Sequence, residues 1–257
     1  MLGAIIGDIV GSRFEFKNHL STDFELFTND CAFTDDTICT VAVADALLKG
    51  ISFEESLQYW CRKYPNPVGA YGGSFGAWVR SENPMPYNSF GNGSAMRVSP
   101  CAWLRNDRAT VLRYAHLSAL CTHDHPEGIK GAIAIADCIY QARQHYRSKG
   151  IIKTLASNEY GYNLDITCDE IRLTNTFNET CQVTVPQAIV CFLESSDFES
   201  AIRLAVSIGG DSDTIAAITG SIAEAFYGIP EHIKIQALRY LPDDIKDVFT
   251  NFLTHIR

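Results

Sequence analysis

The sequence predicts an all-α fold, and three observations favour it. Apolar residues recur at helical spacing from one end of the chain to the other, whereas strict alternation is confined to short stretches such as residues 166–173. Capping residues, prolines and glycines separate these apolar stretches, as helix boundaries require. The chain has 257 residues, of which 46% are hydrophobic, and no linker-like segment divides it, so we expect a single domain over residues 1–257.

The first two expected helices are apolar and closely packed. Gly3, Gly7 and Gly11 fall every fourth residue, which gives the first helix a smooth stripe that a neighbouring helix can approach. Nearly every residue in 38–48 is apolar or small. We therefore expect the second helix to be buried around most of its circumference.

Local signals place several further helix starts. Capping-box pairs begin two helices: Ser52 with Glu55, for a helix reaching about Tyr64, and Ser196 with Glu199, for a helix ending at Gly209. Three prolines stand where a first helical turn would begin: Pro126, Pro186 and Pro242. Between residues 148 and 184 the pattern weakens, and most of this stretch stays unassigned.

The clearest helix follows Gly209. Its apolar face carries Ile215, Ile218, Ile222 and Phe226, and Gly228 to Pro230 provide the stop signal. Gly220 lies inside this helix, which indicates a close contact with a neighbouring helix.

The amino-acid composition argues against several classes of function and location. With 21 basic and 30 acidic residues, the net charge is −9, which argues against a broad surface for nucleic acid or anionic membranes. The nine cysteines include no C-x-x-C pair, so we expect reduced thiols used as small core residues. The apolar N-terminal run contains Asp8 and has no basic flank, unlike a signal peptide or a membrane span. We therefore expect a cytoplasmic protein, and a monomer.

Two acidic clusters each precede a strongly apolar helix. The first is Asp35 and Asp36 between two threonines, and the second is Asp211 and Asp213 followed by Thr214. A single aspartate at a helix start is ordinary N-capping, and that interpretation remains open for either cluster alone. Two carboxylates per cluster exceed what capping needs, however, and four brought together would repel one another without cations. Carboxylate and hydroxyl ligands suit Mg²⁺ or Mn²⁺ better than zinc.

The sequence resembles the ADP-ribosylglycohydrolase family, typified by the enzyme that reactivates dinitrogenase reductase. The resemblance spans nearly the whole chain and rests on motifs that occur in the family's order. They are GAIIGDIVG at 3–11, FEF at 14–16, FTDDT at 33–37, GNGSAMR at 91–97, TH at 122–123 with PEG at 126–128, and GGDSDTIA at 209–216. The resemblance implies a compact orthogonal helical fold with two divalent metal ions, Mg²⁺ or Mn²⁺, in a cleft.

By matching positions, the resemblance also implies ligands and roles. Thr34, Asp35 and Asp36 would hold one metal, Asp211 and Thr214 the other, and Asp213 would bridge them. Glu15 matches a glutamate on a mobile loop near the metals. The alternative interpretation is that Glu15 is a solvated loop acid with no role at the metals. Glu15, Asp36 and Asp213 are the carboxylates expected to handle protons in catalysis, and the sequence does not choose between them.

ADP-ribose would bind along a glycine-containing loop. Backbone N–H groups and the Ser94 hydroxyl would contact the diphosphate, and the expected ligand-binding residues are Gly91, Asn92, Gly93, Ser94, Met96 and His123. Asn92 is equally well a turn residue. His125 is expected in the turn before Pro126 rather than at a metal. Phe75, in the less sharply defined segment 71–75, is expected to pack in the core.

The expected activity is hydrolysis of the bond between an acceptor and C1 of the ribose distal to adenine. A metal pair would orient the ribose and lower the pKa of a water, while the site stabilises oxocarbenium character. Two alternatives stay open: a catalytically silent protein that binds ADP-ribose, and a two-metal phosphohydrolase. The partner would be an ADP-ribosylated protein or another ADP-ribosylated substrate, and the acceptor linkage is open between arginine, serine and others.

Overall fold

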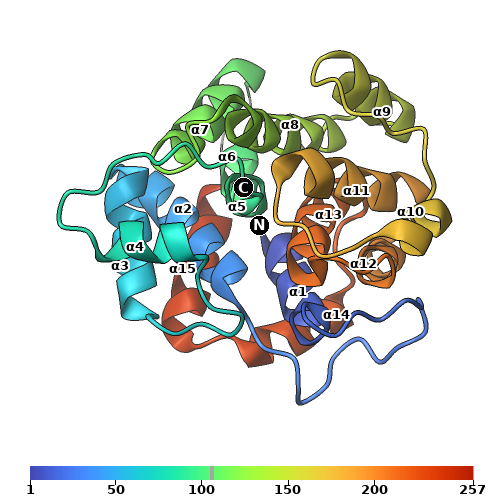
Figure 1. Ribbon diagram of the computed structural model, residues 1–257, viewed down its shortest axis with the longest axis horizontal. Helices are drawn as coiled ribbons and strands as arrows, with labels where there is room; N and C mark the ends of the chain where they lie inside the picture. Colours follow the sequence, from blue (N-terminus) through green and yellow to red (C-terminus); the bar gives the residue numbers. More distant parts are fainter. Residues whose placement is uncertain (105–106, 257) are drawn as a thin grey trace.

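The computed structural model describes residues 1–104 and 107–256, and within these ranges it is helical (Figure 1). The β-type pairing there is limited to two isolated bridges, one between Thr34 and Val68 and one between Gly91 and Thr180. The all-α prediction is therefore confirmed. Among the described residues, no helix combines the length and the apolar character that a membrane crossing requires.

Two glycine-bearing helices pack against each other at the centre. Helix α1 (Leu2–Gly11) lies along α13 (Ser212–Tyr227), with α2 to α4 on one side of the pair and α10 to α12 on the other in Figure 1. A Cβ on Gly3 would overlap the carbonyl oxygen of Gly220, and one on Gly7 would overlap that of Ala216. Close approach of two backbones needs residues without side chains at these positions, so the packing predicted from the glycine stripe is confirmed.

The second helix, α2 (Asp35–Lys49), begins at Thr34, whose hydroxyl accepts the N–H of Asp36 at 3.2 Å. Its residues from Asp36 to Ala46 are buried, as predicted. Gly50 ends it with φ of 68°, a left-handed conformation that glycine adopts without strain. Helix α3 (Phe53–Lys63) then begins at Ser52, as expected.

The remaining helices complete the shell around this centre. Helices α11, α12 and α8 contact α13, and α15 contacts α2. Their bounds, with two short 3-10 turns, are η1 (Ser12–Phe14), α4 (Gly73–Arg80), α5 (Gly93–Met96), α6 (Ser99–Trp103), α7 (Arg108–Leu120), α8 (Pro126–Ala142), α9 (Lys149–Asn158), α10 (Cys168–Thr174), α11 (Cys181–Glu194), α12 (Phe198–Ser207), α14 (Glu231–Ala237), η2 (Leu238–Tyr240) and α15 (Asp243–His255).

Two predicted helix starts were wrong. Helix α12 is capped by Asp197 with Ser200, one residue later than the expected pair Ser196 and Glu199. Pro186 lies inside α11, not in its first turn. The chain before α11 pairs with the glycine-containing loop, where Cys181 N–H donates to the carbonyl of Phe90 at 3.0 Å. This long-range contact fixes the helix start ahead of the proline.

The stretch left unassigned by the sequence, residues 148–184, contains two short helices. Ser148 caps α9, and Thr167 with Glu170 forms a complete capping box that starts α10. Helix α10 occupies most of the stretch whose alternation resembled a strand. Its seven residues were too few for a helical period to be recognised.

Candidate active site

A cleft of about 650 Å³ opens where the starts of α2 and α13 meet the glycine-containing loop. Most residues singled out in the sequence line it. They are Glu15, Asp35, Asp36, Gly91, Asn92, Gly93, Met96, His123, Asp211, Asp213 and Thr214. Segments far apart in the sequence thus contribute to one cavity.

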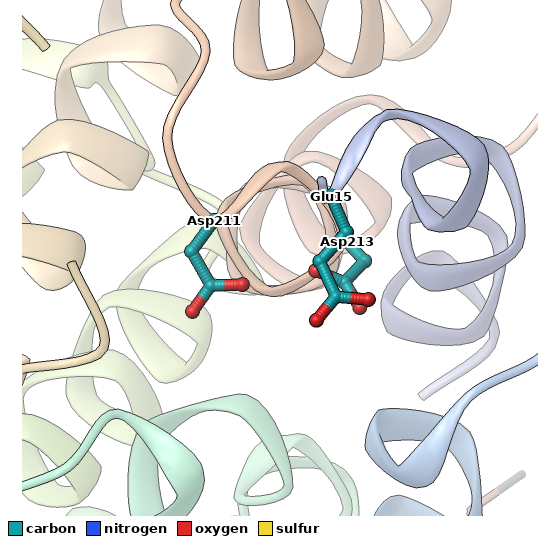
Figure 2. A group of neighbouring side chains, drawn as sticks. All are labelled: Glu15, Asp211 and Asp213. Atoms are coloured by element: carbon teal, nitrogen blue, oxygen red, sulfur yellow. The ribbon is translucent and has the colours of Figure 1, made fainter. Parts of the chain in front are cut away.

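Three carboxylates converge at the first turn of α13. One oxygen each from Glu15, Asp211 and Asp213 lies within 4.8 Å of the others, and Figure 2 shows the Glu15 side chain reaching this turn from the loop after α1. Asp211 and Asp213 are 5% and 3% exposed, so these charges are shielded from solvent. Acidic groups in such a buried arrangement require protons or cations.

The aspartates of α2 join the same cleft. Asp36 Oδ1 accepts a hydrogen bond from the Thr214 hydroxyl at 3.2 Å. Its other oxygen, Oδ2, is buried without a hydrogen-bond partner, as are Asp213 Oδ1 and Glu15 Oε2. Buried polar atoms without partners are rare in folded proteins, and here they face a shared cavity. The arrangement is that of a site for cations, and it fits oxygen-preferring divalent ions.

Burial and mutual repulsion raise the pKa of every carboxyl in this group. Burial, with added repulsion from Asp213, raises the pKa of Glu15 to about 8. The pKa of Asp211 rises to about 6, mainly through burial. Burial, followed by the charge of Asp213, holds the pKa of Asp35 and Asp36 well above the ordinary range, and the pKa of Asp213 rises in the same way through burial and the charge of Asp211.

Asp8 is a component of the site that sequence analysis did not assign. It is fully buried on α1, where its carboxylate accepts the backbone N–H groups of Thr34 and Thr37 at 3.0 and 3.1 Å and both threonine hydroxyls. Asp8 therefore caps α2 from a neighbouring helix and fixes the position of Asp35 and Asp36. A lone acid within an apolar helix was the available signal.

The structure does not bring two expected residues to the cleft lining. Thr34 is fully buried, and its hydroxyl donates to Asp8 at 2.7 Å. Ser94 is also fully buried, and its hydroxyl donates to the carbonyl of Gly128 at 2.7 Å. Both hydroxyls thus donate hydrogen bonds within the protein, and the roles expected for Thr34 and Ser94 as metal and diphosphate ligands stay predictions.

Asn92 connects the glycine-containing loop to the acidic group. Its side-chain amide donates to Asp211 Oδ2 at 2.6 Å and to the Thr184 hydroxyl at 3.1 Å. Its backbone N–H donates to the carbonyl of Glu179 at 2.7 Å. Asn92 is thus a turn residue that also contacts a candidate metal ligand, and the ADP-ribose contact expected of it stays a prediction.

The two neighbouring histidines have different roles. His123 is 4% exposed and lines the cleft beside Gly91 and Gly93. His125 caps α8, and its Nδ1 accepts the N–H of Glu127 at 3.1 Å. The expected position of His125 in the turn before Pro126 is confirmed.

Aromatic side chains surround the cleft. Phe75 is 9% exposed and stacks on Trp78, as the core-packing prediction required, but it also lines the cavity. Phe16 and Phe177 lie at the entrance with ring centroids 5.9 Å apart, and they are 74% and 44% exposed. Phe177, together with the lining residue Glu179, falls in the stretch that the sequence left unassigned.

Comparisons with known proteins agree with this geometry. The profile of a family described as ADP-ribosylglycohydrolase matches residues 1–256. A Danio rerio protein named ADP-ribosylhydrolase ARH3 is 27% identical over 302 residues, which cover 89% of this chain and 82% of that protein. The ADP-ribosylarginine hydrolase Tri1 of Pseudomonas putida is 25% identical over 272 residues, covering 89% of this chain and 70% of that protein.

A solved structure has the same fold. It is titled "ADP-ribosylglycohydrolase-related protein complex" and matches with a TM-score of 0.73 at 22% identity, covering 100% of this chain and 96% of that one.

Proposed function

This chain belongs to the ADP-ribosylglycohydrolase family, and from that premise we propose that it hydrolyses the glycosidic bond between ADP-ribose and a modified acceptor. The observation that carries the proposal is the convergence of the two acidic helix starts on one cleft, joined by the hydrogen bond from Thr214 to Asp36. A cavity of about 650 Å³ is of the size typical for a nucleotide-sized ligand.

Two divalent cations, Mg²⁺ or Mn²⁺, fit the lining residues. Carboxylate and hydroxyl oxygens are their preferred ligands, and the unpartnered oxygens of Asp36 and Asp213 need positive charge. The residues that would hold the cations are Asp35, Asp36, Asp211, Asp213 and Thr214. When bound, divalent cations supply Lewis-acid chemistry, in which they polarise ribose hydroxyls and lower the pKa of water.

The remaining groups of the cleft would bind and orient the substrate. The loop Gly91–Gly93 leaves room for the diphosphate, because glycines place no Cβ between backbone and ligand. His123 lies beside this loop and would contact the same part of the ligand. The carboxyl of Glu15 would hold or transfer a proton near the distal ribose, because its side chain reaches the acidic group at the first turn of α13.

A panel of defined substrates tests this function. Peptides carrying ADP-ribose on arginine or on serine would be incubated with the protein in Mg²⁺, Mn²⁺ or chelator, and products separated by chromatography. Arginine-linked ADP-ribose belongs in the panel because the Pseudomonas putida relative is named for it. Release of free ADP-ribose in metal but not in chelator is expected. Binding without release would indicate a silent member, and release of inorganic phosphate would indicate a phosphohydrolase.

A further inference from the structure

Thr122 lies between a buried arginine and the histidine of the cleft. Its Oγ1 is 2.7 Å from an Arg97 guanidinium nitrogen and 2.7 Å from His123 Nδ1. All three residues are buried, with Arg97 1% exposed. The donor in each of these hydrogen bonds follows from the chemistry of the groups.

The direction of the first bond is fixed. A guanidinium has only donors, so Thr122 Oγ1 must accept from Arg97. The single hydroxyl hydrogen of Thr122 remains to be placed. One candidate acceptor is His123 Nδ1, and the other is the neighbouring Cys121 sulfur, which is a weak acceptor and itself donates to the carbonyl of Ser118 at 3.4 Å.

Two arguments place this hydrogen on the bond to His123. An imidazole nitrogen with a free lone pair is a much better acceptor than a thiol. The positive charge of Arg97 also favours a lone pair, rather than an N–H, on the side of the ring that faces it. The same charge, together with burial as the larger cause, holds the pKa of His123 well below its ordinary value, so the ring is neutral.

In a neutral ring with Nδ1 as acceptor, Nε2 carries the proton. This nitrogen faces the glycine-containing loop, where an ideal Cβ on Gly93 would lie 3.1 Å from it and one on Gly91 would lie 3.6 Å from it. Among the described residues, the hydrogen bond of the ring is made by Nδ1 and none is made by Nε2. The ring therefore presents an unused N–H to the cleft.

We propose that Arg97 and Thr122 are positioning residues that hold His123 as the neutral Nε2–H tautomer, so that it donates to a phosphate oxygen bound over the loop Gly91–Gly93. A phosphate oxygen only accepts hydrogen bonds, so the opposite tautomer would present a lone pair to it and repel it. The identity of the ligand rests on the proposed function, whereas the tautomer does not.

Nitrogen NMR of the ligand-free, full-length protein tests the tautomer directly. The protein has seven histidines, and the ring signals of His123 would be assigned by their loss in His123→Gln. We expect a protonated Nε2 and an unprotonated Nδ1. Thr122→Val, which keeps the shape but removes the hydroxyl, should shift the ring toward a mixture of tautomers, and Thr122→Ser should restore the wild-type pattern.

Calorimetric titration with ADP-ribose tests the consequence. We expect Thr122→Val to weaken binding by about threefold or more, because Kd rises in inverse proportion to the fraction of the ring that keeps the Nε2–H tautomer, and Thr122→Ser to stay within about twofold of wild type. The matched control is Thr219→Val, which removes a buried hydroxyl that donates to the carbonyl of Ala188 at 3.0 Å, outside the cleft lining. This control should bind like wild type.

The outcomes separate this proposal from the proposed function. A proton on Nδ1 in the wild type, a tautomer unchanged in Thr122→Val, or unchanged affinity despite a changed tautomer would each overturn the positioning role. If the tautomer is as expected but the wild type binds no ADP-ribose, the role in phosphate recognition and the proposed function both fail, while the assignment of protons stands.

Discussion

The hydroxyl of Thr214, at the start of α13, donates to Asp36 Oδ1, at the start of α2, over 3.2 Å. This bond joins two helix starts that are separated by most of the chain. It is the direct contact between the two acidic clusters, and it brings their carboxylates to one cleft. Capping alone explains one acid at each helix start but gives no reason for the two starts to meet.

The position of α2 should depend on Asp8. Asp8→Asn would keep one oxygen for the N–H groups of Thr34 and Thr37 but would put an NH₂ group, in place of an acceptor, against the Thr34 hydroxyl. We expect this to lower the free energy of unfolding by about 1–3 kcal/mol. Urea denaturation measures this loss. Asp165→Asn, which alters an exposed ion pair with Lys153, is the matched control and should change stability by less than about 1 kcal/mol. Equal stability of the two variants would mean that Asp8 does not cap α2.

The packing of α1 against α13 should tolerate no side chain at Gly7. Gly7→Ala would place a Cβ against the backbone of Ala216, so we expect a loss of about 2 kcal/mol or more in the free energy of unfolding. Gly150→Ala, in the first turn of α9, would bring its Cβ no closer than 3.8 Å to the Ser148 hydroxyl oxygen, an ordinary contact, and should be neutral or slightly stabilising. Thermal unfolding compares the two. A Gly7→Ala protein as stable as Gly150→Ala would contradict the close helix contact.

Substitution of Glu15 should lower the turnover rate more than the affinity for ADP-ribose. Glu15→Gln removes the proton-transfer group but keeps its size, so we expect kcat to fall by about 10²-fold or more while the Kd for ADP-ribose changes by less than about threefold. Glu55→Gln, on exposed α3 surface, is the matched control and should keep full activity. An unchanged kcat in Glu15→Gln would remove Glu15 from the chemistry.

Stability in chelator should fall as pH rises. Folding raises the pKa of Asp211 to about 6 and of Glu15 to about 8, from ordinary carboxyl values near about 4. Between about pH 4 and pH 8 the folded state therefore binds more protons than the unfolded state, so the free energy of unfolding decreases across this window. Divalent cations should offset the repulsion, and the gain in Tm on adding Mn²⁺ should be larger at about pH 8 than at about pH 5. An equal gain at both values would contradict the buried acidic cluster.

Local patterns in the sequence were sufficient for much of the fold. The glycine stripe of α1, the capping residue Ser52 and the stop at Gly228 each encode a helix boundary or face within a few residues, and the structure confirms them. The acidic helix starts were visible for the same reason. Their convergence was inferred from repulsion between charges and from the family resemblance, since spacing along a chain does not reveal distance in space.

The parts that sequence analysis missed depend on long-range contacts. Pairing of the chain near Gly91 with Thr180 sets the start of α11 and brings Phe177 and Glu179 to the cleft. The hydroxyls of Thr34 and Ser94 donate to buried acceptors on other helices, which the sequence did not indicate. Neither helical periodicity nor capping residues indicate partners that are distant in the sequence.

Counting bound Mn²⁺ by electron paramagnetic resonance tests the central claim most directly, because it depends on neither substrate nor turnover. The account predicts two ions per wild-type chain. Because Asp213 is expected to bridge the two ions, Asp213→Asn should lose both while its helical circular dichroism is unchanged. A wild-type chain that binds no Mn²⁺, or a folded Asp213→Asn protein that binds two ions as tightly as wild type, would contradict it.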